Sequence, residues 1–105
     1  MMDYNDILES IQLVMNDMVN DDLLDGAVVV DGETQIIGEN SPLDSIVLVV
    51  FLTGLEEKLE AARGKKTMLV LDRIHNFNVS DTMHRFEPAH PTLHVDTLVR
   101  FIQTL

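Results

Sequence analysis

The sequence contains no cysteine. This absence excludes disulfide bonds, thiolate metal sites and thiol nucleophiles together, so we expect packing to stabilise the fold, as in proteins made in a reducing compartment. No basic, apolar leader opens the chain, and the longest apolar run, 46–52, is too short to span a bilayer. These absences favour a soluble, cytoplasmic protein. The length of 105 residues predicts one domain covering 1–105.

Lysine, arginine and histidine are all missing before Lys58. Thirteen acidic residues precede that position, whereas the rest of the chain carries seven Lys or Arg against five Asp or Glu, and the formal net charge is -11. An acidic surface repels phosphate backbones and favours encounter with basic protein surfaces. We therefore expect no nucleic-acid partner, although solubility alone also explains such a charge.

Three segments have the apolar spacing of one helical face. In 3–20 the apolar positions are Ile7, Ile11, Val14, Met15 and Met18. A second helix is predicted from Pro42 or Ser45 to about Ala62, with a core stripe of Leu48, Phe51, Leu52, Leu55 and Leu59. The last helix is predicted from His94 or Val95 to the end, on Val95, Leu98, Val99, Ile102 and Leu105. A short helix is expected near 81–86. The predicted fold class is therefore all-α.

Two segments between these helices are less regular. Residues 27–37, AVVVDGETQII, hold two β-branched runs around Asp31-Gly32, which is a hairpin signature. Two isolated strands are barely stable in water, so an extended loop anchored by Ile36 and Ile37 is an equally acceptable prediction. The structure of the second segment, 64–91, is left open by the sequence.

The second helix carries more aliphatic residues than one core can cover. On a helical wheel Ile46, Val50 and Thr53 fall nearly opposite the core stripe, with Val47 and Val49 on the flanks. Exposed aliphatic patches of this kind mark contact surfaces, so these five residues are predicted to bind partner proteins. The alternative is that the segment 64–91 folds over the patch.

Two serines lie four positions apart at the start of that helix. Ser41-Pro42-Leu43-Asp44 has the pattern of a capping box, with serine at the N-cap and proline at the first helical position. Ser41 is therefore interpreted as structural. Ser45 would lie in the first turn, where unpaired N–H groups and the positive end of the helix dipole stabilise an attached phosphate. No motif of an activated nucleophile surrounds it, so Ser45 is predicted to be an acceptor.

At these residues the chain resembles the acyl carrier protein family, whose modification site is an Asp-Ser-Leu triplet at the start of the second helix of a four-helix bundle. The triplet here is Asp44-Ser45-Ile46. Such a triplet alone arises by chance in about one chain of this length in ten. The resemblance extends over nearly the whole chain. It includes the acidic composition, the segment GENSPLDSIVLVVFLTGLEEKL around the predicted second helix, and TLVRFI in the predicted last helix. It is strongest to stand-alone carrier proteins.

The resemblance implies a role for each residue of the triplet. A phosphopantetheinyl transferase would move 4'-phosphopantetheine from coenzyme A to the Ser45 hydroxyl, and Asp44 would help that transferase recognise the site. Ile46 replaces the usual leucine and keeps an aliphatic contact for partner enzymes. The chain would then be a monomeric, non-enzymatic carrier of thioesters in fatty-acid or secondary-metabolite biosynthesis. Its partners would be acyl- or aminoacyl-activating and condensing enzymes.

Two features depart from the family pattern. Val47 and Val50 stand where family members often have acids early in the second helix, which predicts more apolar docking. The connection 64–91 is longer than in fatty-acid carriers.

Two other hypotheses remain open on the sequence. An unmodified acidic helical adaptor would use the same aliphatic patch without any cofactor on Ser45. A zinc site is suggested by His75, His84, His90 and His94. Pro91 interrupts the last pair and no cysteine accompanies it, so surface histidines are the favoured interpretation and no metal is expected.

Overall fold

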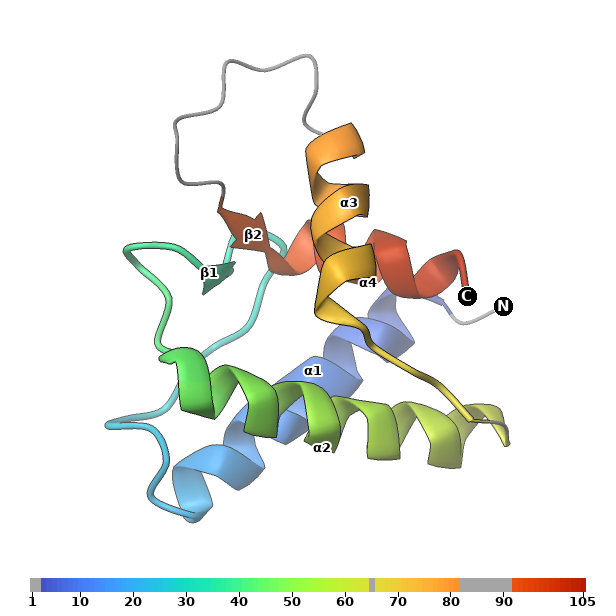
Figure 1. Ribbon diagram of the computed structural model, residues 1–105. Coiled ribbons are helices and arrows are strands. Elements are labelled where there is room, and N and C mark those ends of the chain that lie inside the picture. Colours follow the sequence, from blue (N-terminus) through green and yellow to red (C-terminus); the bar gives the residue numbers. More distant parts are fainter. Residues whose placement is uncertain (1–2, 65, 82–91) are drawn as a thin grey trace.

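The computed structural model describes residues 3–64, 66–81 and 92–105. Over these residues the chain forms helices and a small antiparallel sheet, in the order α1 (Tyr4–Asn20), β1 (Gln35–Ile37), α2 (Ser45–Arg63), α3 (Leu71–Asp81), β2 (Leu93–His94) and α4 (Val95–Gln103) (Figure 1). The mainly helical class predicted from the sequence is confirmed, and the two-stranded sheet is an addition to it. Within the described ranges, no helix combines the length and apolar character needed to cross a membrane.

The core is built where α1 packs on both α2 and α4 (Figure 1). On α1 the buried residues are the five predicted from periodicity: Ile7, Ile11, Val14, Met15 and Met18. On α2 the buried residues are Val47, Phe51, Leu52, Leu55 and Leu59. Leu48, predicted to lie in that stripe, is only partly buried against the core. The apolar periodicity thus identified both helices and nearly all of their packing faces.

The helix α3 runs from Leu71 to Asp81, within the segment whose structure the sequence left open. The short helix predicted near 81–86 falls, apart from Asp81, on residues 82–86, which lie outside the described ranges. Ile74 is buried, and the rings of Phe77 and Phe101 meet edge to face with centroids 5.7 Å apart, which packs α3 on α4. Few apolar residues occur in α3, so its periodicity in the sequence is weak, and contact with α4 stabilises it instead.

Residues 27–37 do not form a hairpin with one another. Gly32 and Glu33 make a turn, closed by a hydrogen bond from Thr34 N–H to Asp31 O of 3.2 Å. After this turn β1 pairs with the distant strand β2, with an irregularity in the register. Of the two predicted anchors, Ile36 is buried and Ile37 is 37% exposed. The extended-loop alternative is therefore the correct one up to Thr34, and the strand that follows is completed by a segment from the other end of the chain.

The side chain of Gln12 on α1 holds this connection against the core. Its Nε2 donates to Val28 O at 2.7 Å, and its Oε1 accepts from Val30 N–H at 2.8 Å. The Gln12 amide therefore supplies the hydrogen-bond donor and acceptor that a neighbouring strand would otherwise give to the backbone of Val28 and Val30. Two further bonds, from Val95 N–H to Thr34 O and from Asp96 N–H to Gly32 O, fix the turn to the start of α4.

Candidate functional site

The N-cap of α2 is Asp44, and the prediction that Ser41 caps the helix is wrong. Asp44 Oδ1 accepts a hydrogen bond of 2.8 Å from Val47 N–H, and its main-chain oxygen accepts from Leu48 N–H. An N-cap carboxylate stabilises a helix both by this hydrogen bond and by its charge at the positive end of the dipole. Pro42 consequently lies before the helix and not at its first position.

Ser41 is still structural, but in the connection that leads to α2. Its hydroxyl donates to Ile36 O at 2.6 Å and accepts from Leu43 N–H at 3.1 Å. The main chain of Ser41 also donates to Gly38 O. These bonds close the turn between β1 and α2. Their combined effect is to set where α2 can begin.

Ser45 is the first residue of α2, and its side chain is exposed. Over the described ranges its hydroxyl has neither a base nor any other side chain as a hydrogen-bond partner. No acidic residue lies in the first turn of α2 itself. The geometry therefore suits a hydroxyl that receives a group from another molecule, and a phosphate on it would face the unpaired N–H groups of the helix terminus.

An aliphatic face extends from Ser45 along α2. Ile46 is 78% exposed, Val49 56% and Val50 41%, and Thr53 is exposed one turn further on. We call these four residues the α2 aliphatic face. The described part of the 64–91 connection leaves them exposed, and residues 82–91 lie outside the described ranges. Exposed aliphatic groups that share one side of a helix form a surface suited to protein contact.

Val47 does not belong to this face, contrary to the prediction. It is 9% exposed and belongs to the core cluster, one turn before Phe51. The wheel placed Val47 on a flank, and the core cluster extends to that flank. The predicted partner-binding set is therefore reduced from five residues to the four of the α2 aliphatic face.

The histidines are not assembled by the structure. His75 is exposed on α3, His94 precedes α4 as its N-cap, and His84 and His90 lie outside the described ranges. In the part of the chain that the structure describes, no group of three or more His, Asp or Glu is placed to hold a metal ion.

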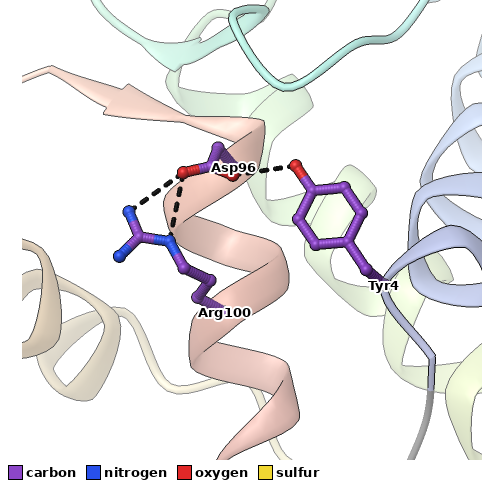
Figure 2. Close-up of polar contacts among 3 residues, drawn as sticks. All are labelled: Tyr4, Asp96 and Arg100. Carbon is purple, nitrogen blue, oxygen red and sulfur yellow. Dashed lines mark hydrogen bonds and ion pairs between the residues drawn. The ribbon is translucent and has the colours of Figure 1, made fainter.

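A polar cluster that sequence reasoning missed joins the first turns of α1 and α4. The Tyr4 hydroxyl donates to Asp96 Oδ1 at 2.8 Å, and Arg100 forms an ion pair with Asp96 Oδ2 at 3.0 Å. Figure 2 shows Tyr4 and Arg100 on either side of the Asp96 carboxylate. Burial and, next, the hydrogen bond to Asp96 raise the pKa of Tyr4 above its ordinary value. The spacing of Asp96 and Arg100, four residues apart on one helix, is a signal that the sequence contains. No sequence signal indicates the contact with Tyr4, which is 92 positions away.

This cluster borders an open polar cavity of about 610 Å³ lined by Gly32, Glu33, His94, Asp96, Thr97 and Arg100. Gly32 approaches the cluster closely, because a Cβ there would lie 3.1 Å from the Tyr4 hydroxyl oxygen. The observed contacts give the cluster a structural role: it joins the turn at 32–33, α1 and α4.

Comparisons of the chain with family models, curated proteins and solved structures gave no match. Support for a function therefore comes from the geometry around Ser45 and from the sequence motif that contains it.

Proposed function

We propose that this chain is an acyl or aminoacyl carrier protein that holds thioester-linked cargo on a 4'-phosphopantetheine arm attached to Ser45. The observation that carries the proposal is the position of Ser45: an exposed hydroxyl at the first residue of α2, directly after the Asp44 cap. The Asp-Ser-aliphatic triplet resembles the modification site of carrier proteins, and the helix terminus stabilises a phosphodiester.

The arm supplies the reactive thiol that this cysteine-free chain lacks. The residues of the chain have positioning roles. Asp44 keeps α2 capped, so that Ser45 stays at the surface, and its exposed carboxylate is available to a transferase. The α2 aliphatic face provides the neighbouring contact for partner enzymes. All bond making and breaking on the cargo belongs to those partners.

Intact-mass measurement after co-expression with a phosphopantetheinyl transferase tests the modification. The wild-type chain is expected to gain one phosphopantetheine, and Ser45→Ala is expected to gain none. Ser10→Ala is the matched control, because Ser10 is a serine on α1 whose hydroxyl bonds only within its own helix, to Asp6 O. An unmodified wild-type chain, or modification that survives Ser45→Ala, contradicts the proposal.

A second candidate function is an adaptor that binds a partner protein through the α2 aliphatic face and needs no modification. The exposure of Ile46, Val49 and Val50 favours it, since exposed aliphatic side chains grouped on one helix mark contact surfaces. The Ser45→Ala variant separates the two functions in a complementation assay. For an adaptor, Ser45→Ala retains function and Val50→Asp abolishes it, whereas for a carrier Ser45→Ala abolishes function.

A further inference from the structure

The scarce cations of this acidic chain gather at the end of α2 that lies away from Ser45. A shallow cavity of about 280 Å³ is lined there by Arg63, Lys66, Thr67, Met68, Arg73 and Leu105. Three of the seven Lys and Arg residues in the sequence therefore face one small concave site. The other lining residues are a hydroxyl side chain and two apolar ones.

We call this site the basic cavity. Its three cations differ in whether they already have hydrogen-bond partners. Arg63 is fixed, since its Nη1 donates to Thr67 Oγ1 at 3.0 Å and its Nη2 donates to the main-chain oxygen of Leu105 at 3.1 Å. Lys66 and Arg73 have no hydrogen-bond or ion-pair partner within the described ranges. Elsewhere on α2, by contrast, Lys58 forms a 3.0 Å ion pair with Asp17. Two unneutralised cations and a fixed guanidinium thus share the cavity.

Negative groups near the cavity offset part of this charge. Glu60 Oε1 accepts from Thr67 N–H at 3.1 Å, and the terminal carboxylate of Leu105 contacts Arg63. The carboxyl end of α2 adds about half a negative charge. These groups together nearly balance the three cations, but no acidic side chain lines the cavity among the described residues, and none pairs there with Lys66 or Arg73. The side of the cavity formed by Lys66 and Arg73 therefore favours an anion.

We propose that the basic cavity binds the phosphate group of a small molecule. Guanidinium groups present several N–H donors in a planar fork that matches phosphate oxygens, and an ammonium adds a compact charge. A volume of about 280 Å³ suits a small group of this kind. Extended polyanions are disfavoured, because the remaining surface of a chain with net charge -11 repels nucleic acids and anionic membranes.

This site is independent of the proposed carrier function. Ser45 begins α2 and Arg63 ends it, and a helix of 19 residues is about 28 Å long. Electrostatic interaction over that distance is largely screened at physiological ionic strength, where the Debye length is about 8 Å. Phosphate binding at the cavity is therefore expected to be the same in the wild type and in Ser45→Ala.

The test is an NMR titration of the full, isotope-labelled chain with inorganic phosphate, at constant pH and ionic strength. We expect saturable shifts of the amides of Thr67 and Met68. Lys66→Gln and Arg73→Gln should each weaken binding by roughly fivefold or more, since each removes a charge-assisted hydrogen bond. Lys58→Gln is the matched control, because it removes one positive charge from α2 outside the cavity, and it should change the affinity less than twofold.

A second titration with butyl phosphate distinguishes a phosphate monoester from free phosphate. Tighter binding of the ester indicates that Met68 and Leu105 contact an organic group, and equal binding indicates that the site takes free phosphate. The proposal is overturned if neither compound gives saturable shifts. It is also overturned if Lys58→Gln weakens binding as much as Lys66→Gln, since the effect would then be one of overall charge. Because Ser45 plays no part, these results leave the carrier proposal untouched.

Discussion

The Tyr4 hydroxyl donates a 2.8 Å hydrogen bond to Asp96 Oδ1 across 92 positions of sequence. This bond joins the first turn of α1 to the first turn of α4, beside the turn at Gly32. Arg100 orients the same carboxylate from one turn further along α4. The two ends of the described chain are therefore held together by a polar contact as well as by the core.

Replacing Tyr4 by phenylalanine is expected to lower the free energy of unfolding by about 1 kcal/mol, because the half-buried Asp96 loses a neutral hydrogen-bond donor while the ring keeps its packing. Urea denaturation measures the change. Tyr4→Leu, which also loses the aromatic ring, should cost more. A Tyr4→Phe variant as stable as the wild type would show that the bond contributes nothing.

The pH dependence of this contact can be measured directly, since Tyr4 is the sole tyrosine in the sequence. Burial and then the hydrogen bond to Asp96 raise its pKa above the ordinary 10.0. The folded state therefore binds the phenolic proton more tightly than the unfolded state does. The stabilisation is fully present below pH 10 and is lost as the pH rises through the folded-state pKa. Ultraviolet titration of the native protein should give a midpoint above that of the urea-unfolded chain, and equal midpoints would contradict this account.

Asp44 and Ser41 should have separable effects on stability. Asp44→Ala removes the cap and is expected to cost about 1 kcal/mol, with loss of hydrogen-exchange protection at Val47 N–H. Ser41→Ala should instead expose Leu43 N–H and leave Val47 protected. Asp44→Asn, which keeps an accepting oxygen, should retain most of the stability. Loss of protection at Val47 in Ser41→Ala would restore the capping-box interpretation.

Gln12 is expected to be among the most sensitive polar residues of α1. Gln12→Ala leaves Val28 O and Val30 N–H without their side-chain partner, so a loss of about 1–3 kcal/mol is predicted. Asn16→Ala is the matched control, because Asn16 Oδ1 accepts only an exposed bond from the same amide. Hydrogen exchange at Val30 should accelerate in the first variant and not in the second.

Gly54 lies where α2 meets α1, and a Cβ on it would lie 3.3 Å from Val14 Cγ1. Alanine is favoured over glycine inside a helix by about 0.5–1 kcal/mol, but this close contact opposes the gain. We expect Gly54→Ala to be nearly neutral in the wild type and to stabilise a Val14→Ala background. A double-mutant cycle measured by urea denaturation gives the coupling, and an effect that is equal in both backgrounds would exclude the steric explanation.

Much of the helical framework could be predicted from the sequence, because the relevant signal is local. The apolar spacing on α1 identified Ile7, Ile11 and Met15 as buried, and the structure agrees. Val47 was assigned to the exposed face because a helical wheel gives the angle between residues but not the width of the face that the core buries. The cap was misassigned because Ser41 and Asp44 are both good N-cap residues. They are distinguished by their hydrogen bonds: the Ser41 hydroxyl donates to Ile36 O and accepts from Leu43 N–H, whereas Asp44 accepts from Val47 N–H.

The features that could not be predicted depend on contacts between distant parts of the chain. β1 has its partner in β2, and the Tyr4 contact spans almost the whole sequence. The basic cavity likewise needs α2, the following connection and α3 to bring Arg63, Lys66 and Arg73 together. No periodicity or turn signal records such pairings, because each participating segment is compatible with several partners.

The pairing of β1 with β2 has a consequence for the order of folding. Gly32 and Thr34 accept hydrogen bonds from the first residues of α4, and β1 is completed only by Leu93 and His94. Contacts of such long sequence separation carry a high loop-closure cost and form late. The segment that leads into Ser45 should therefore acquire its final shape only after the carboxyl-terminal helix has docked. During synthesis on the ribosome, α1 and α2 would emerge early, while the surroundings of Ser45 would be completed last.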